Sequence, residues 1–93
     1  GAPQLPQERM IANADLLTHN EIVLYPNPTS GLIHIKHDEK LTDIQIFDMV
    51  GKLLIKHKCN GQTETNIDLS NLPNGLYYVK PNYYNSIKVF KNE

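Results

Sequence analysis

The stretch IQIFDMVGKLLIK, residues 44–56, decides the fold class of this chain. Apolar and polar residues alternate up to Phe47, which is the period of a strand with one buried face. Gly51 then occupies the position at which a type I turn with a bulge needs a positive φ. The stretch therefore predicts an antiparallel hairpin whose returning strand has Leu53 and Ile55 on one face.

The same rhythm extends in both directions from this hairpin. Short β-rich runs are separated by turn residues such as Gly, Pro, Asn and Ser. The predicted strands are residues 22–25, 32–36, 44–47, 52–56, 63–69, 76–80 and 86–91. Seven strands at this spacing, without a convincing helix, predict an all-β fold, a small immunoglobulin-like antiparallel β-sandwich. A true immunoglobulin domain is excluded, since there is no Cys…Trp…Cys pattern.

Composition narrows the possible functions. The chain has 93 residues, which suits one domain with a small core. Its net charge is −1, so it lacks the basic excess of a nucleic-acid-binding surface. The single cysteine, Cys59, cannot form an internal disulfide, and no apolar run is long enough to span a bilayer.

Residues 1–21 differ in character from the rest of the chain. They contain two prolines and no apolar alternation, with a weak helical period between Gln7 and Leu17. We interpret residues 1–21 as a linker or lead and residues 22–93 as the folded domain.

The four histidines of the chain invite a metal hypothesis, which concerns His34, His37, His57 and the single cysteine, Cys59. His34 and His37 are three apart on or near a predicted strand, so they should point to opposite faces. His57 and Cys59 share a face but do not complete a tetrahedral zinc site. We predict ordinary surface histidines, with no metal and no cofactor.

The sequence also gives little support to catalysis. No serine lies in a nucleophile motif, and no glycine-rich phosphate loop occurs. Asp43, Asp48 and Asp68 lie at predicted strand ends, where carboxylates commonly cap backbone amides. We therefore predict that the domain is not an enzyme.

Tyrosines are the remaining candidates for a ligand surface. Tyr77 alternates with Val79 and should pack inward, so Tyr78 should face out, while Tyr83 and Tyr84 lie in the loop of the last predicted hairpin. Exposed tyrosines favour contacts with proteins or sugar rings, although they also commonly cover the open end of a sandwich.

Four motifs, in order, resemble the type A C-terminal sorting domains of type IX secretion. The first is VLYPNPTSG at residues 23–31, and the second is DMVGK at residues 48–52. The third is IDLSNLPNGLYYV at residues 67–79, and the fourth is the terminal KVFK at residues 88–91. Any one of them alone is weak, but the ordered set is specific.

Residues of the first and third motifs also have a physical interpretation that does not depend on the resemblance. Pro26 and Pro28 should end the ladder of the first strand, because proline lacks the N–H donor. Asn27 should be extended, since a proline follows it. Gly31 should allow the chain to turn into the second strand, and Gly75 should allow a close backbone approach.

The resemblance implies a sorting signal at the C-terminus of a larger exported protein of the Bacteroidetes group. The cargo would cross the periplasm, be recognised at the outer-membrane translocon, and be cut from the domain by a cell-surface sortase within the linker. It would then be attached to lipopolysaccharide at the cell surface or released outside the cell. The residues expected to support recognition are Pro26, Asn27, Pro28, Gly31, Gly75, Tyr77, Lys88 and Lys91. The prolines and glycines would shape loops, Tyr77 would support the core, and the lysines would contact the machinery.

Three alternatives remain open from the residues. The domain could be an adhesion or carbohydrate-binding module with a platform of Tyr78, Tyr83 and Tyr84, or a structural spacer. The terminal strand could also exchange between two copies as a swapped homodimer, if its outer edge is unpaired.

Overall fold

Seven antiparallel strands make up the part of the chain that the computed structural model describes, residues 22–93. They are β1 (Val23–Tyr25), β2 (Leu32–Lys36), β3 (Asp43–Phe47), β4 (Leu53–Lys58), β5 (Glu64–Asp68), β6 (Gly75–Pro81) and β7 (Ile87–Lys91). All seven predicted strands are confirmed, with ends that shift by one or two residues. The predicted linker at 1–21, with its weak helical period, lies outside the described residues. Residues 22–93 contain no helix that could cross a membrane.

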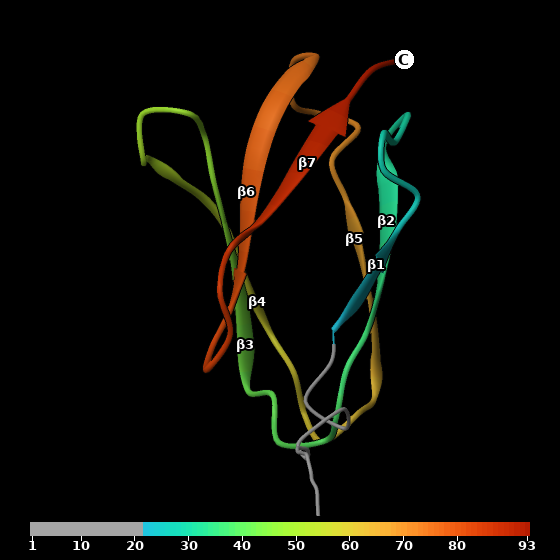
Figure 1. Ribbon diagram of the computed structural model, residues 1–93, viewed down its shortest axis with the longest axis vertical. Coiled ribbons are helices and arrows are strands. Elements are labelled where there is room, and N and C mark those ends of the chain that lie inside the picture. Colours follow the sequence, from blue (N-terminus) through green and yellow to red (C-terminus); the bar gives the residue numbers. More distant parts are fainter. Residues whose placement is uncertain (1–21) are drawn as a thin grey trace, which may run out of the picture.

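The strands form two facing sheets (Figure 1). One sheet has the order β1-β2-β5 and the other the order β4-β3-β6-β7. Every pairing in both sheets is antiparallel. The predicted all-β sandwich is therefore confirmed.

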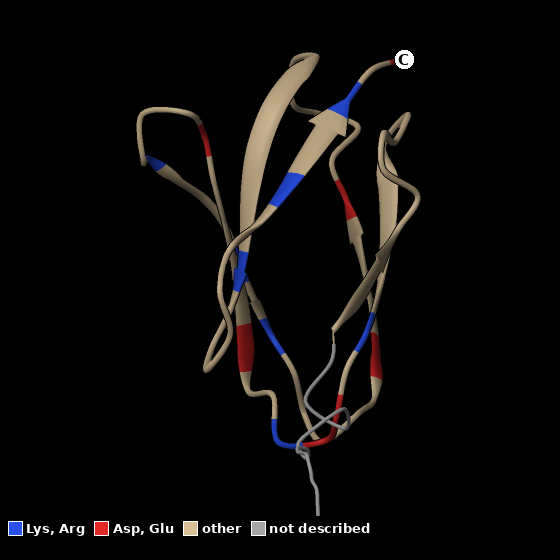
Figure 2. Cartoon of the chain, in the orientation of Figure 1, with Lys and Arg blue, Asp and Glu red and all other residues tan. Residues whose placement is uncertain are grey.

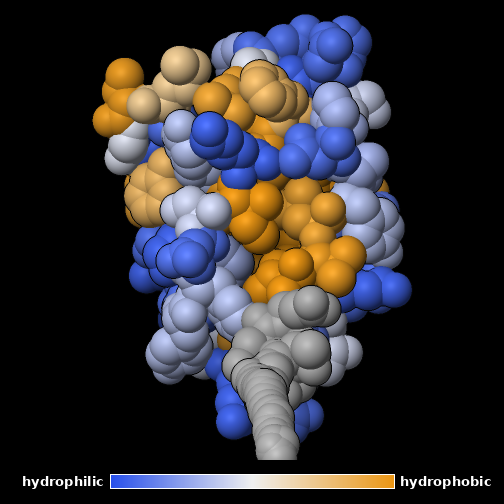
Figure 3. All heavy atoms as spheres, viewed as in Figure 1, coloured by the Kyte–Doolittle hydropathy of each residue, from blue (hydrophilic) through white to orange (hydrophobic). Residues whose placement is uncertain are grey.

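Apolar side chains at every second strand position fill the space between the two sheets. Ile33 and Ile35 of β2 are completely buried, as are Ile44 and Ile46 of β3. Full burial of one such side chain stabilises the fold by about 1.5–3 kcal/mol. The other buried apolar residues are Leu41, Cys59, Ile67, Leu69, Tyr77, Val79 and Val89. On the side where β1 and β7 face the viewer, apolar atoms are also visible at the surface (Figure 3).

The β3–β4 hairpin has the predicted turn but a different register. Gly51 has a φ of +86°, and its amide donates to the Asp48 carbonyl over 3.1 Å. The pairing shifts between Ile46 and Phe47, so that Leu53 lies opposite Phe47. The prediction that Leu53 shares the inner face with Ile55 is wrong, because the bulge turns Leu53 to the surface, where it is 45% exposed.

The sandwich has two distinct ends. We call one the motif end; it holds the loops 26–31, 48–52 and 70–74 and the last residues, 92–93. The other is the entry end, where Ile22 leads into β1 and where the loops 37–42, 59–63 and 82–86 lie. Figure 1 shows the C-terminus at the motif end, opposite the start of β1. All the turn motifs that are far apart in the sequence thus meet at one end of the fold.

Candidate functional site

The loop after β1 covers the outer edge of β7. The Asn27 side-chain amide donates through Nδ2 to the Lys88 carbonyl over 2.8 Å. Its Oδ1 accepts from the Phe90 amide over 3.0 Å. The Asn27 side chain thereby binds two backbone groups on the outer edge of β7, whereas β6 pairs with the other edge. The first motif and the fourth motif are joined directly at this point.

Thr29 continues the same contact with its backbone. Its amide donates to the Phe90 carbonyl over 2.8 Å, and its carbonyl accepts from the Asn92 amide over 2.8 Å. These bonds form a short parallel bridge between Thr29 and Lys91. Because the edge of β7 is covered, the premise that this strand has an unpaired edge is wrong; the swapped dimer itself stays a prediction.

Sequence reasoning did not single out Thr29, which is only 2% exposed. Its hydroxyl donates to the Leu32 carbonyl over 2.7 Å and accepts from the Gly31 amide over 3.0 Å. The sequence signal that could have indicated Thr29 is a β-branched residue within a proline-rich turn. Thr29 fixes the loop that Asn27 extends along β7.

The prolines on either side of Asn27 end β1 as predicted. β1 stops at Tyr25, and both the Tyr25–Pro26 and Asn27–Pro28 peptide bonds are cis. Pro26, Asn27 and Pro28 are all exposed. The loop is therefore an accessible element that is fixed to β7 through the Asn27 side chain.

The two terminal lysines have different environments. Lys88 is exposed on the outer face of β7, whereas the side chain of Lys91 is 1% exposed. The Lys91 ammonium lies 3.0 Å from Glu93 Oε1 and 3.5 Å from Asn74 Oδ1. Asn74 Oδ1 also accepts from the Glu93 amide. A side chain held this way does not reach a partner while β7 stays in place, so direct contact remains a prediction for Lys88 alone.

The structural reasons for glycine at positions 31 and 75 are exchanged relative to the prediction. A Cβ on Gly31 would lie 2.6 Å from Ser70 Oγ, so the close approach of Ser70 favours glycine there. Gly75 has a φ of +153° and open space around its missing Cβ, so the backbone conformation requires glycine. Gly31 also accepts from the Leu69 amide over 2.8 Å, which ties the first motif to the third.

Tyr77 is a core residue, as expected. It is 5% exposed, and its hydroxyl donates to the Pro73 carbonyl. It lies opposite Val89 in the β6–β7 pairing. The third motif therefore supports β7 from the inner side while the first motif covers its edge.

Two aspartates cap turns as predicted. Asp48 Oδ1 accepts from the Val50 and Lys52 amides over 3.0 and 2.9 Å. Asp68 Oδ1 accepts from both the hydroxyl and the amide of Ser70. The Ser70 hydroxyl, then its amide, and the charge of Lys91 hold the pKa of the Asp68 carboxyl below its ordinary value. Asp43 does not follow this pattern, because its carboxylate caps no backbone amide among the described residues.

His37 is not a surface histidine. It is 7% exposed, with Nε2 2.8 Å from Thr65 Oγ1 and Nδ1 2.8 Å from the Asp38 carbonyl. Cys59 Sγ lies 3.5 Å from the same Thr65 hydroxyl. The prediction of a surface histidine is therefore wrong for His37, because the alternation of β2 continues one residue beyond the strand and places His37 on the buried face with Ile33 and Ile35. Within residues 22–93, no three His, Cys, Asp or Glu side chains gather as a metal site.

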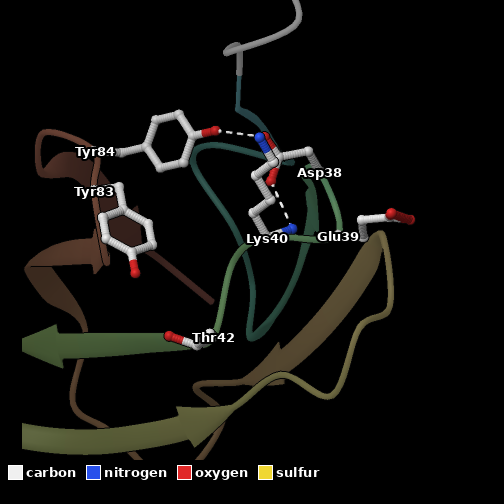
Figure 4. A pocket seen from close by; sticks show the side chains of 6 residues that line it. All are labelled: Asp38, Glu39, Lys40, Thr42, Tyr83 and Tyr84. Atoms are coloured by element: carbon white, nitrogen blue, oxygen red, sulfur yellow. Dashed lines mark hydrogen bonds between the residues drawn. The ribbon is translucent and has the colours of Figure 1, made fainter.

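The outward tyrosines do not form a single platform. Tyr83 and Tyr84 line an open hollow of about 820 Å³ at the entry end, together with Asp38, Glu39, Lys40 and Thr42 (Figure 4). Tyr83 is 80% exposed, and the Tyr84 hydroxyl donates to Asp38 Oδ2 over 3.1 Å. Burial, followed by this bond, raises the pKa of the Tyr84 hydroxyl. Tyr78 lines a different hollow, beside Phe47 and Met49.

Comparison with known proteins identifies the family. No curated protein matches the chain. The family model described as "Secretion system C-terminal sorting domain" matches residues 23–92, which include every strand and all four motifs. The chain therefore belongs to the C-terminal sorting domains of type IX secretion, and it carries the sorting signal of an exported protein.

Proposed function

We propose that residues 22–93 direct an upstream cargo across the outer membrane and are removed afterwards. The observation behind this proposal is the motif end, where hydrogen bonds join the first, third and fourth family motifs around β7. A small domain with a preformed end is suited to being recognised as a folded shape.

The recognised element is the motif end as a unit. Pro26 and Pro28 present the loop, and Asn27 acts as a positioning residue that keeps it on the edge of β7. Gly31, Gly75 and Tyr77 maintain the backbone and the inner support, and Lys91 fixes the terminal residues. Lys88 supplies an exposed ammonium on the same strand.

The partners in this proposal are the outer-membrane translocon and a cell-surface sortase. The translocon binds the folded domain in the periplasm, and the sortase cuts within residues 1–21. The cargo then stays at the cell surface, attached to lipopolysaccharide, or is released outside the cell. The domain itself acts by being bound and catalyses no reaction.

A reporter fusion tests this proposal. The 93-residue chain is attached to a periplasmic reporter with a signal peptide, in a host that has type IX secretion. We expect the reporter at the surface or in the medium, and its loss when residues 88–93 are deleted. A reporter that stays in the periplasm behind the intact domain would refute the proposal.

The hollow at the entry end supports a second candidate, a carbohydrate-binding accessory role. It places the exposed Tyr83 ring beside carboxylates and a hydroxyl, the groups that contact sugars. A glycan array separates the two candidates. Binding that is lost in Tyr83→Ala would favour this role, and its absence would leave the sorting signal alone.

A further inference from the structure

The outer face of the four-stranded sheet is divided into a polar half and an apolar half. Toward the entry end its outward positions hold Asp43, Gln45, Lys56, Lys58 and Lys80. Toward the motif end, Phe47 lies opposite both Leu53 and Tyr78, and Leu76 lies opposite Phe90. We call these five residues, Phe47, Leu53, Leu76, Tyr78 and Phe90, the apolar half-face.

This half-face has no partner within the described part of the chain. Leu53 is 45% exposed and Phe90 is 52% exposed, while Phe47, Leu76 and Tyr78 are half-buried. The solvent face of an antiparallel sheet is usually polar, as it is in the other half of this sheet. A contiguous apolar area on such a face commonly marks an interaction site.

The β3–β4 turn extends the apolar area beyond the sheet. Met49 is 69% exposed and Val50 is 88% exposed. Figure 3 shows apolar atoms where this hairpin projects from the molecule. Hollows of about 300 and 220 Å³ flank the turn, one lined by Phe47, Met49 and Tyr78 and the other by Met49, Val50 and Leu76.

Hydrogen bonds within the turn hold the backbone that carries these side chains. Asp48 Oδ1 accepts from two turn amides, and Gly51 donates back to the Asp48 carbonyl. A preformed turn loses little conformational entropy on binding.

The charges around this surface are mostly positive. The outward positions of the strands hold Lys56, Lys58, Lys80 and Lys88 against the single carboxylate of Asp43, and Figure 2 shows blue segments on β4, β6 and β7. The Asp48 carboxylate beside the turn is occupied by backbone amides. Since the whole chain has a net charge of −1, the positive charge is concentrated on this face.

We propose that the apolar half-face and the tip formed by Met49 and Val50 are a docking surface for a protein. The matching surface of that protein is apolar and is bordered by Asp and Glu side chains that face the lysines. A protein fits better than a lipid bilayer, because three of the five half-face side chains are half-buried and leave little apolar surface to insert into lipid. That the protein belongs to the secretion machinery rests on the proposed function.

A pair of matched double variants tests the docking surface in the reporter fusion. Leu53→Ser with Val50→Ser alters it, and Leu32→Ser with Val23→Ser is the control. Leu32 is 45% exposed and Val23 is 49% exposed, and both lie on the other sheet. We expect about tenfold lower export for the first variant, because truncated interface anchors commonly cost that much or more. Export of the control variant should be unchanged.

Thermal unfolding of both purified variants checks that each is folded. All four residues are exposed, so both midpoints should stay close to that of the unmodified chain. Equal export of the two folded variants would overturn the docking surface while leaving the sorting function in place.

Photo-crosslinking gives a readout that does not depend on export. A benzophenone amino acid is placed at position 53 or at position 32 of the same fusion in the same cells, and the adducts are mapped by mass spectrometry. We expect a single protein adduct from position 53, at apolar residues flanked by Asp or Glu, and its loss in Val50→Ser. If the unmodified fusion stays in the periplasm, the proposed function fails, yet this adduct still tests the docking surface.

Two results would overturn the proposal directly. One is the same adducts from positions 53 and 32. The other is flotation of the purified chain with phosphatidylglycerol vesicles that is lost in Leu53→Ser with Val50→Ser, which would assign the surface to lipid.

Discussion

Replacing Asn27 with alanine should loosen β7 without disturbing the core. The variant loses the hydrogen bonds to the Lys88 carbonyl and the Phe90 amide, at 2.8 and 3.0 Å. Each such bond contributes about 0.5–1.5 kcal/mol, and both partner groups are near solvent, where water replaces the amide in part. We therefore expect the free energy of unfolding to fall by about 1.5 kcal/mol. For a domain of this size, that lowers the unfolding midpoint by roughly 6–12 °C.

Guanidinium denaturation followed by circular dichroism measures this change. Asn71→Ala is the matched control, because Asn71 is an exposed asparagine at the same end whose side chain makes no hydrogen bond within the described residues. Amide hydrogen exchange adds a local readout, since the Phe90 amide should lose protection in Asn27→Ala. An unfolding free energy equal to that of Asn71→Ala, with an unchanged exchange rate at Phe90, would refute the edge-covering role of Asn27.

Three further predictions follow from the same end of the fold. Lys91→Met should change the unfolding free energy by less than about 1 kcal/mol, because Met keeps the packing of the buried stem and the ion pair lost is with a Glu93 side chain that is 61% exposed. Lys91→Ala should cost about 2–4 kcal/mol through a cavity, and equal losses of unfolding free energy for the two variants would contradict this. Gly31→Ala and Gly75→Ala should each lower the free energy of unfolding by about 1–2 kcal/mol. Ser70→Ala should restore stability only in Gly31→Ala, because only the Cβ at position 31 meets the Ser70 hydroxyl, and a double-mutant cycle measures this difference. Because the folded pKa of Asp68 lies below its ordinary value of 3.8, the ionised carboxylate stabilises the domain at pH values above 3.8, and this contribution is lost as the pH falls through the folded pKa. Unfolding measured from pH 6 to pH 2 should therefore depend less steeply on pH in Asp68→Asn, and identical slopes would count against it.

The strands could be predicted from the sequence because a strand is recognised by the alternation of neighbouring side chains. Alternating side chains in Ile33–Ile35 and Ile44–Ile46 have only one arrangement that buries every isoleucine, and these residues are indeed completely buried. The turn at Gly51 could also be predicted, since a positive φ depends on the type of a single residue. Leu53 escaped the prediction, because the bulge that turns it outward depends on the partner strand β3.

The sequence named several residues of the motif end, but it did not indicate what they contact. The motifs named Asn27 and Lys91, yet nothing near Asn27 in the sequence indicates that its amide bonds residues more than sixty positions away. The burial of Lys91 and His37 was hidden for the same reason, since Asn74 and Thr65, which contact them, lie far away in the sequence. The apolar half-face was also out of reach, because it exists only once β4, β3, β6 and β7 lie side by side.

Local sequence patterns were enough to establish the all-β class, the seven strands and the family. These follow from patterns within a few neighbouring positions and from the order of four motifs. Only the tertiary structure decided that the edge of β7 is covered, that Gly31 is required by space and Gly75 by conformation, and that Lys88 is accessible while Lys91 is not. The physical reason is that edge pairing, close approach and burial are relations between segments distant in the chain, which local patterns do not encode.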